Sequence, residues 1–327
     1  MYADDANIIL TANTIDEIDA QLKKLTKDLL KWTDDNGLAL NLKKTNYMIF
    51  SRSNNIELPE PLIVSETLIE HKHEARFLGV IVDESLSWTC HVKAVQSKMS
   101  RYVGIMYKIK KFLPLNARQQ IYHSFFQSYV NYCSLVWGFT AKSNIDSLFA
   151  KQKKALRAVI PGFINYKYKN GKLPGHTKSK FSDYKILTIH NIIAQNAFIL
   201  LHKIQNYPSL IPQSIRDTIP DNSPVVGSTH QDCENWLKVY DNQYYRKSVF
   251  FKGPILLSGT TLNSNLPLTS FLTIKFYKRN VKEALLKLQS SGDTCDWQSN
   301  NFVLYNYLGL RRSQTSYRQQ INYNIND

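Results

Sequence analysis

Two adjacent acidic residues near the start of the sequence are the strongest candidates for chemistry. Asp4 and Asp5 follow Tyr2 and Ala3 and come directly before a short apolar run at residues 6–10. In one interpretation they are turn residues, because Asp tolerates left-handed backbone geometry and caps turns locally. In the other they bind a metal, since two like charges held together repel unless a divalent cation offsets them, and carboxylate oxygens suit Mg²⁺. These residues alone leave both interpretations open.

An amphipathic helix is expected directly after this apolar run. Thr14 and Glu17 form a capping box, in which the Thr hydroxyl and the Glu carboxylate each accept a backbone N–H at the helix start. Apolar residues then recur every three or four positions and form one stripe: Ile15, Ile18, Leu22, Leu25 and Leu29. Asn36-Gly37 provides the stop, so we predict a helix from about residue 14 to residue 36.

Strands are expected to follow. Leu38, Leu40 and Leu42 alternate with other residues, and residues 47–50 and 76–82 have the composition of strands, as residues 6–10 do before the helix. We therefore predict an α+β region up to about residue 85.

From residue 91 the sequence has a helical pattern and is strongly basic. Apolar spacing predicts a helix up to Leu113, one entered at Asn116 with Ile121, Phe125 and Tyr129 facing inward, and others at 143–160, 186–204 and about 270–288. Residues 91–185 contain 18 Lys or Arg and two acidic residues, a local charge of +16, whereas the remaining 23 basic and 24 acidic residues give −1. Because one continuous third carries the excess charge, a polyanionic partner is expected.

Nine basic residues are the candidate contacts to nucleic acid: Lys93, Lys98, Arg101, Lys108, Lys110, Lys111, Lys153, Lys154 and Arg157. The first six lie on a helix whose other face is apolar, so they form a cationic ridge. Neutralising six phosphates would give a log–log salt slope of about −4 on single strands. Tyr102, Tyr107 and Tyr122 are candidate stacking residues, although aromatics at helical spacing are more often core residues.

Several sequence blocks follow one another in a distinctive order. They are Tyr2-Ala-Asp-Asp5, residues 37–45, Phe77-Leu-Gly-Val80, Leu86-Ser-Trp88, Tyr132-Cys-Ser-Leu-Val-Trp137-Gly138, Lys154-Ala-Leu-Arg157, Gly253-Pro254, Leu266-Pro267 and Phe276-Tyr-Lys278. In type and order they resemble the reverse transcriptases of non-LTR, jockey-like retrotransposons, over nearly the whole chain.

The resemblance implies a two-metal nucleotidyl transfer, in which a DNA primer 3′-hydroxyl attacks an incoming deoxynucleoside triphosphate on an RNA template. On this mapping Asp4 and Asp5 bind Mg²⁺, and Tyr2 lies near the primer terminus. Lys44 matches a position from which a lysine could protonate departing pyrophosphate, although a Lys-Lys pair at a strand start is commonly a solvated charge.

A second implied contact is the turn that meets the primer. Phe77, Leu78 and Gly79 match this turn in the family, where Gly allows nucleic acid to approach the backbone closely. The alternative is an ordinary core strand with a bulge.

The sequence departs from the family at its front. In the family the Asp-Asp turn joins two antiparallel strands, and a companion aspartate lies on an earlier strand, whereas only Met1 precedes Tyr2 here. We therefore expect a polymerase fragment that lacks the fingers and the first catalytic aspartate and is inactive alone. The alternative is a non-catalytic nucleic-acid-binding remnant that uses only the basic helices.

Composition and resemblance together predict four regions. Residues 1–86 are expected to be the C-terminal half of a palm, with short antiparallel strands plus a helix, and residues 87–164 a basic, thumb-like helical region. Residues 165–312 follow as a mainly helical C-terminal region that begins with an exposed basic loop, and residues 313–327 as a disordered tail. The expected fold class is thus α+β, a truncated palm followed by helices.

Histidines and cysteines suggest other sites. His71-x-His73 and Cys90-His91 contain residue types that bind Zn²⁺, but their spacing fits no closed structural site. His123, His190 and His202 are expected to be hydrogen-bonded core residues.

The cellular setting is also indicated by composition. Four widely spaced cysteines without C-x-x-C favour a reducing, intracellular location, nuclear or cytoplasmic, over secretion. The longest apolar stretch, 186–204, is interrupted by polar residues, so no membrane partner is expected. The sequence leaves protein partners open.

Overall fold

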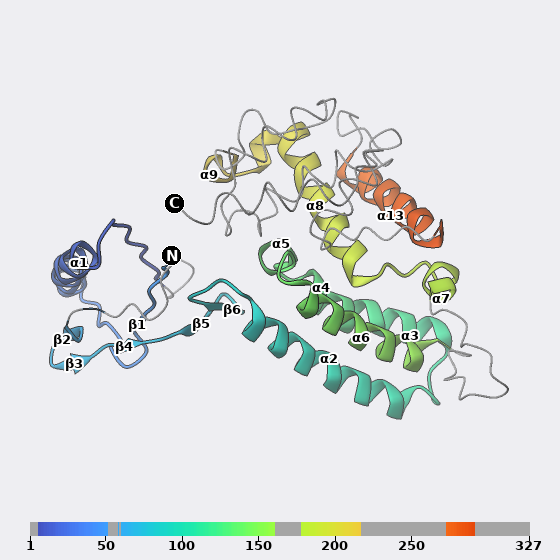
Figure 1. Cartoon of the computed structure of the whole chain (residues 1–327), viewed down its shortest axis with the longest axis horizontal. Helices are drawn as coiled ribbons and strands as arrows, with labels where there is room; N and C mark the ends of the chain where they lie inside the picture. The colour runs from blue at the N-terminus through green and yellow to red at the C-terminus, as the bar shows by residue number, and fades with distance from the viewer. Residues whose placement is uncertain (1–5, 52–57, 59, 161–177, 217–272, 292–327) are drawn as a thin grey trace, which may run out of the picture. The chain divides into compact units, whose positions relative to one another are not determined.

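A computed structural model describes residues 6–51, 58, 60–160, 178–216 and 273–291 (Figure 1). The chain divides into two compact units, Met1–Cys90 and His91–Asp327. The described parts are rich in helices and contain a few short strands in small sheets, in agreement with the α+β class. No helix among the described residues is long and apolar enough to cross a membrane.

The first unit is built around helix α1 (Ile15–Asp35), which begins and ends as its sequence predicts. The Thr14 hydroxyl accepts the backbone N–H of Glu17 at 3.3 Å, and the Glu17 carboxylate accepts the N–H of Asn13 at 3.1 Å. Gly37 stops the helix with φ +63°, and its N–H donates to the Asp34 carbonyl. This left-handed position favours glycine because it has no Cβ.

The strands of the first unit form three separate two-stranded ladders. Strand β1 (Asn46–Tyr47) pairs in parallel with β4 (Glu70–His71), while β2 (Ile63–Val64) pairs antiparallel with β3 (Thr67–Leu68), and β5 (Glu74–Phe77) with β6 (Val80–Asp83). A small core of Leu62, Val64 and Ile69 holds them, with Leu22, Leu30 and Tyr47 packed against it.

Several predicted strands differ from the observed ones. Residues 6–10 and 38–42 form no strand, and Ile9 is 89% exposed. Residues 76–82 are a hairpin instead of one strand, since a turn at Leu78-Gly79 reverses the chain. Alternation of apolar residues thus failed to predict strands where the chain offers no partner to complete the ladder.

A buried carboxylate closes the turn between β6 and the next helix. Asp83 accepts the Ser85 hydroxyl at 2.6 Å and the backbone N–H groups of Ser87 and Trp88 at 2.9 and 2.8 Å. Burial opposes ionisation, but these hydrogen bonds outweigh it and lower the pKa of Asp83. The Leu86-Ser-Trp88 block is therefore explained by the turn, in which Leu86 and Trp88 have positive φ.

The second unit is helical. Its described elements are α2 (Thr89–Ile109), α3 (Leu115–Ile121), the π-helix η1 (Tyr122–Gln127), α4 (Ser128–Asn131), α5 (Ser134–Trp137), α6 (Lys142–Val159), α7 (Lys178–Asp183), α8 (Ile189–Asn206), the 3-10 helix η2 (Pro208–Leu210), α9 (Gln213–Arg216) and α13 (Ile274–Ser291). Helix α8 lies against α4, α5, α6 and α13 (Figure 1).

The π-helix changes which residues face the core. The expected inward residues were Ile121, Phe125 and Tyr129, but Tyr122, Phe126 and Val130 are buried and Phe125 is exposed. The buried residues keep the expected spacing of four but lie one position later than predicted, from Tyr122, the first residue of η1, onward.

Two buried glutamines hold the loop that leads into α8. The Gln152 amide on α6 donates to the Tyr122 hydroxyl and the Leu187 carbonyl at 2.8 and 2.9 Å, and accepts the Ile189 N–H at 3.0 Å. The Gln289 amide on α13 donates to the Ile186 carbonyl and accepts the Thr188 N–H, each at 3.1 Å. The backbone of residues 186–189 is therefore paired from both sides.

The block that contains Trp137 and Gly138 is a packing motif. Trp137 is buried, and its indole N–H donates to the Tyr132 carbonyl at 2.9 Å. Gly138 is packed so tightly that an added Cβ would overlap the Ser134 carbonyl oxygen and lie 2.9 Å from Cγ2 of Ile193 on α8. The block thus joins α5 to α8.

Other predictions fall on residues that the structure leaves undescribed. The basic loop lies outside the described residues up to residue 177, and so do the Gly253-Pro254 and Leu266-Pro267 blocks and the tail at 313–327. The helix predicted at 186–204 starts at Ile189, and the one predicted at about 270–288 is α13. His202 is buried and stacks on Tyr277, and His190 is half-buried, but His123 is exposed, contrary to expectation.

Replacing Gly138 with Ala should destabilise the second unit by about 2 kcal/mol, because the new methyl group has no room. The measurement is urea unfolding of the full chain followed by helical circular dichroism. Gly104 on α2 has open space around it, so Gly104→Ala is the matched control and should be neutral or stabilising by about 0.5–1 kcal/mol. Equal urea midpoints for the two variants would contradict the packing argument.

Candidate nucleic-acid interface

The acidic doublet cannot be placed in this structure. Tyr2, Asp4 and Asp5 lie outside the described residues. Lys44 is described and exposed in the turn at residues 42–44, where its N–H donates to the Asn41 carbonyl at 3.0 Å. Its role relative to the doublet stays a prediction.

The turn at Leu78-Gly79 is a tight hairpin with an unusual backbone. Phe77 pairs with Val80, so only two residues connect β5 to β6. Both have positive φ, +45° at Leu78 and +81° at Gly79, as the type I′ turn requires. Asn, Asp or Gly normally occupies the first of these positions, and leucine is strained there. The bulged-strand alternative is therefore wrong, and Phe77 and Leu78 are 45% and 39% exposed at this turn.

The cationic ridge follows the exposed side of α2. Lys93, Lys98, Arg101, Lys108 and Lys111 are exposed, and Lys110 is half-buried beside the Tyr107 ring, 4.5 Å from its centroid. The opposite side of α2 is buried through Val92, Val95, Met99, Tyr102 and Met106. The apolar face thus fixes the helix, and the cations face solvent.

Helix α6 carries the other three predicted contacts and is joined to α2. The Lys151 ammonium donates to the Ser100 hydroxyl at 2.8 Å, and Gln96 donates to Ser147. Lys154 is exposed, while Lys153 and Arg157 are half-buried. The Lys153 ammonium lies 4.1 Å from the centre of the Phe149 ring. Both sets of cations therefore lie on helices that side-chain hydrogen bonds join.

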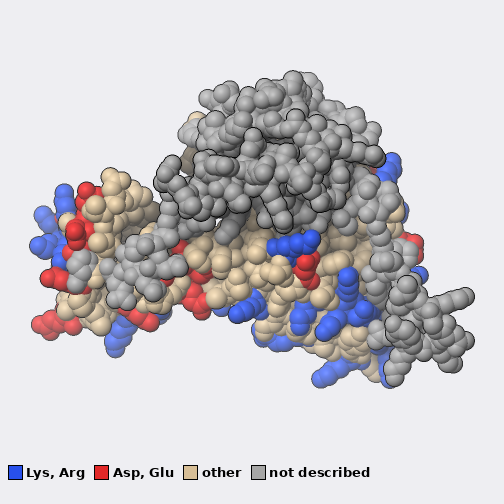
Figure 2. All heavy atoms as spheres, in the orientation of Figure 1, with Lys and Arg blue, Asp and Glu red and all other residues tan. Residues whose placement is uncertain are grey.

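The charge of this surface is not neutralised within the described chain. The acidic residues of the described second unit are Asp146, Asp183 and Glu283, and they lie near His190, Lys180 and Arg279. Among the described residues, none of the nine predicted cations forms an ion pair with a carboxylate. Lys and Arg side chains gather over the region of α2, α3 and α6, with few acidic groups between them (Figure 2). Such a surface attracts polyanions.

Of the three candidate stacking tyrosines, only Tyr107 is exposed, so stacking stays a prediction for that residue alone. Tyr102 and Tyr122 are buried, and burial raises the pKa of both hydroxyls, so neither ring is open to a base. Tyr107 is exposed. Phe112, which the sequence interpretation missed, is 83% exposed directly after Lys110 and Lys111. Its position directly after the last turn of the basic helix α2 is the sequence feature that could have identified it as a candidate stacking residue.

A second cationic site was missed by the sequence interpretation. A pocket of about 310 Å³ lies between η1, α8 and α13. Its lining residues are His123, Gln127, Leu187, Gln195, Lys275, Lys278, Arg279 and Lys282. Burial first, and then nearby Lys185 and Lys278, lower the pKa of Lys282. The spacing of the four basic residues on α13 that line this pocket could have identified this site from the sequence, but α13 lies outside the most basic third of the chain.

The chain is similar to RNA-directed DNA polymerases of Drosophila transposable elements. It is 24% identical over 208 residues to the probable RNA-directed DNA polymerase from transposon BS of Drosophila melanogaster, covering 59% of this chain and 23% of that protein. It is 24% identical over 161 residues to the RNA-directed DNA polymerase from mobile element jockey of Drosophila funebris, covering 48% and 17%. It is 21% identical over 161 residues to the probable polymerase from transposon X-element of Drosophila melanogaster, covering 48% and 18%.

The chain spans about a fifth of the length of these relatives. No protein-family model matches the chain, and no solved structure matches it significantly. The resemblance to the reverse transcriptases of non-LTR, jockey-like retrotransposons is confirmed by sequence similarity over about half of the chain.

Proposed function

We propose that this chain is part of an RNA-directed DNA polymerase, in which the first unit is palm-derived and the second holds an RNA template and a DNA primer. The observation that carries the proposal is the cationic surface of α2 and α6. Its nine basic residues have no carboxylate partner among the described residues, and its buried face keeps them pointed to solvent. Phosphates are the natural counter-charges for such a surface.

The catalytic part of the proposal rests on the acidic doublet. Asp4 and Asp5 offer adjacent carboxylate oxygens, a donor set that fits Mg²⁺, so they are the residues that would hold it. The metal would stabilise charge on the attacking and leaving oxygens of the transfer. Lys44, exposed at its turn, would donate a proton to pyrophosphate, and Tyr2 would lie near the primer terminus.

The turn at Phe77, Leu78 and Gly79 is the proposed primer contact of the first unit. Gly79 leaves backbone open to close approach, and the exposed apolar side chains of Phe77 and Leu78 suit the sugar faces of a primer. A strained leucine at a hairpin tip points to a role outside the fold, because Asn there would relieve the strain.

A second candidate function is nucleic-acid binding without catalysis. It is favoured by the same cationic surface, which needs neither metal nor doublet. Two neighbouring carboxylates are fewer than the ligands that a two-metal site takes from several rigid elements. We therefore expect no primer extension by the 327 residues alone.

Binding to a primer–template should weaken steeply with salt, with a log–log slope of about −4 where it contacts single strands. Fluorescence anisotropy of a labelled RNA–DNA substrate measures this slope. The triple variant Lys93→Gln, Lys98→Gln, Arg101→Gln should reduce its magnitude by about 2. The triple variant Lys24→Gln, Lys27→Gln, Lys31→Gln, with the same charge change on exposed α1 positions, is the matched control and should keep the wild-type slope. A flat salt response of the wild type would overturn the interface.

Leu78→Asn should stabilise the hairpin by about 1 kcal/mol, because Asn suits the left-handed position, and should weaken primer–template binding. Ser65→Asn is the matched control, since Ser65 and Glu66 also have positive φ at the turn between β2 and β3. It should stabilise the unit without affecting binding. Thermal unfolding and anisotropy measure the two effects. Unchanged affinity in Leu78→Asn would exclude this turn as a contact.

Mg²⁺ should raise the thermal midpoint of the wild-type chain, and the double variant Asp4→Asn, Asp5→Asn should lose this shift, because a ligand that binds only the folded state stabilises it. The same samples are assayed for primer extension. Mg²⁺-independent stability together with intact nucleic-acid binding would favour the non-catalytic function. Extension by the wild-type chain that Asp4→Asn abolishes would show that the chain is active alone.

A further inference from the structure

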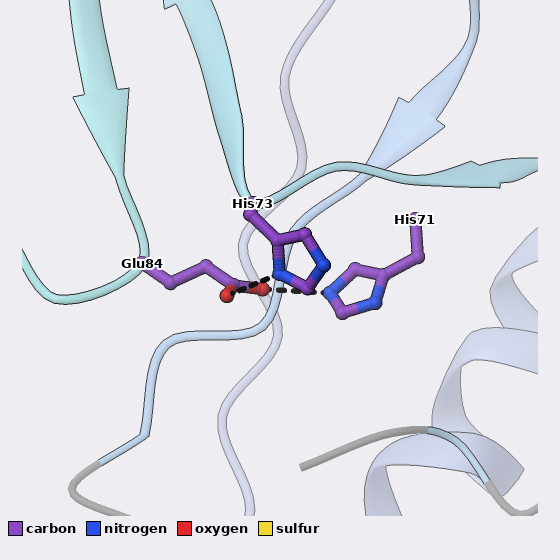
Figure 3. A group of neighbouring side chains, drawn as sticks. All are labelled: His71, His73 and Glu84. Atoms are coloured by element: carbon purple, nitrogen blue, oxygen red, sulfur yellow. Dashed lines mark hydrogen bonds and ion pairs between the residues drawn. The ribbon is translucent and has the colours of Figure 1, made fainter. Parts of the chain in front are cut away.

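Three potential metal ligands meet in the first unit, away from the acidic doublet in sequence. The Nε2 atom of His71 lies 2.7 Å from Oε1 of Glu84, and Nδ1 of His73 lies 2.8 Å from Oε2. One ligand atom from each residue lies within 4.8 Å of the others. Figure 3 shows both imidazole rings turned toward the single carboxylate. The group combines His71 and His73 with Glu84, in place of the Cys90 and His91 considered from sequence.

The local fold explains the convergence. His71 ends β4 and His73 directly precedes β5, so in extended chain their side chains point to the same side. Glu84 lies opposite His73 across the hairpin: Glu74 pairs with Asp83, and the Glu84 N–H donates to the His73 carbonyl at 3.2 Å. The hairpin register thus brings the carboxylate to the histidines.

The ligands are also oriented. The His71 ring stacks on Tyr47, with centroids 5.0 Å apart and planes 8° from parallel, and Tyr47 packs against the core of Leu62, Val64 and Ile69. Burial opposes ionisation of Glu84, but the hydrogen bonds from His73 and His71 outweigh it and lower its pKa. Outer contacts of this kind fix metal-binding histidines.

We propose that His71, His73 and Glu84 bind Zn²⁺. Two imidazole nitrogens and one carboxylate oxygen are a common zinc ligand set, with bonds of about 2.0–2.2 Å and a fourth position for water. Tetrahedral ligands at such bonds are about 3.3 Å apart, so each hydrogen-bonded pair, now at 2.7 and 2.8 Å, needs to open by about 0.5 Å. The His73 side chain is 75% exposed, so an ion reaches the group from solvent.

The zinc site would act as a staple. His71 belongs to the β1–β4 ladder, whereas His73 and Glu84 flank the β5–β6 hairpin. Two-stranded ladders are marginally stable by themselves, and small units commonly add a metal. This inference does not depend on the proposed polymerase function, because imidazole ligands select zinc over the hard Mg²⁺ ion.

Isothermal titration of the untagged full chain with ZnCl₂ tests the site. The wild type should bind one Zn²⁺ that excess Mg²⁺ does not displace, and His71→Ala and His73→Ala should each weaken binding at least about tenfold. His123→Ala removes an exposed histidine on η1 and is the matched control with wild-type affinity. Zn²⁺ should raise the thermal midpoint of the wild type but not of His73→Ala, each compared with its own metal-free midpoint.

Cobalt spectra separate this site from the cysteines. Co²⁺ bound to imidazole and carboxylate gives visible bands without the near-ultraviolet charge-transfer band of a thiolate ligand. Equal Zn²⁺ affinity in the double variant His71→Ala, His73→Ala, a thiolate band in the wild type, or no binding by a wild type that still binds nucleic acid would each overturn the zinc site and leave the proposed function untouched.

Discussion

The second unit depends on the pairing of one buried loop by two glutamines. Residues 186–189 carry the chain into α8 through the middle of the helices, where each unpaired backbone group would cost about 1–3 kcal/mol. Gln152 and Gln289 reach this loop from α6 and α13 and pair it without adding charge. The backbone groups of this loop are all hydrogen-bonded only when α6 and α13 are both in place, so the two glutamines fix the position of α6 relative to α8. Helix α2 is linked to α6 in turn by the hydrogen bond from Lys151 to Ser100.

This neutral interior allows a strongly basic exterior. Like charges on α2 and α6 repel, and no described carboxylate offsets them, so the unit tolerates them because its stability comes from apolar burial and neutral hydrogen bonds. Cations are also crowded on α13, where Lys282 lies near Lys278 and Lys185, although Arg279 pairs with Glu283 on the same helix. In both regions the repulsion between like charges lowers the stability of the folded unit.

Sequence predicted the elements whose signals are local. Helix α1 is specified by Thr14, Glu17 and Gly37, and the amphipathic pattern of α2 separated its core from its cations. The inward face of η1 was missed, because the sequence offers two adjacent apolar rows, Ile121-Phe125-Tyr129 and Tyr122-Phe126-Val130, and only the packing selects the second. The strand predicted at 38–42 is absent, because alternating apolar residues indicate which face of a strand would be buried but not which segment would pair with it. The meeting of Glu84 with His71 and His73 needed the hairpin register, which spacing alone does not contain.

The hairpin links the two proposed sites of the first unit. Its turn, Leu78-Gly79, lies five positions from its base, His73 and Glu84, along each strand, about 17 Å at the rise of an antiparallel strand. A lone two-stranded ladder bends and twists readily, so the position of the turn depends on how firmly the base of the hairpin is held. His71 ties that base to β4, and Tyr47 ties His71 to the core. A metal held there would stiffen the base and so narrow the range of positions open to Leu78 at the turn.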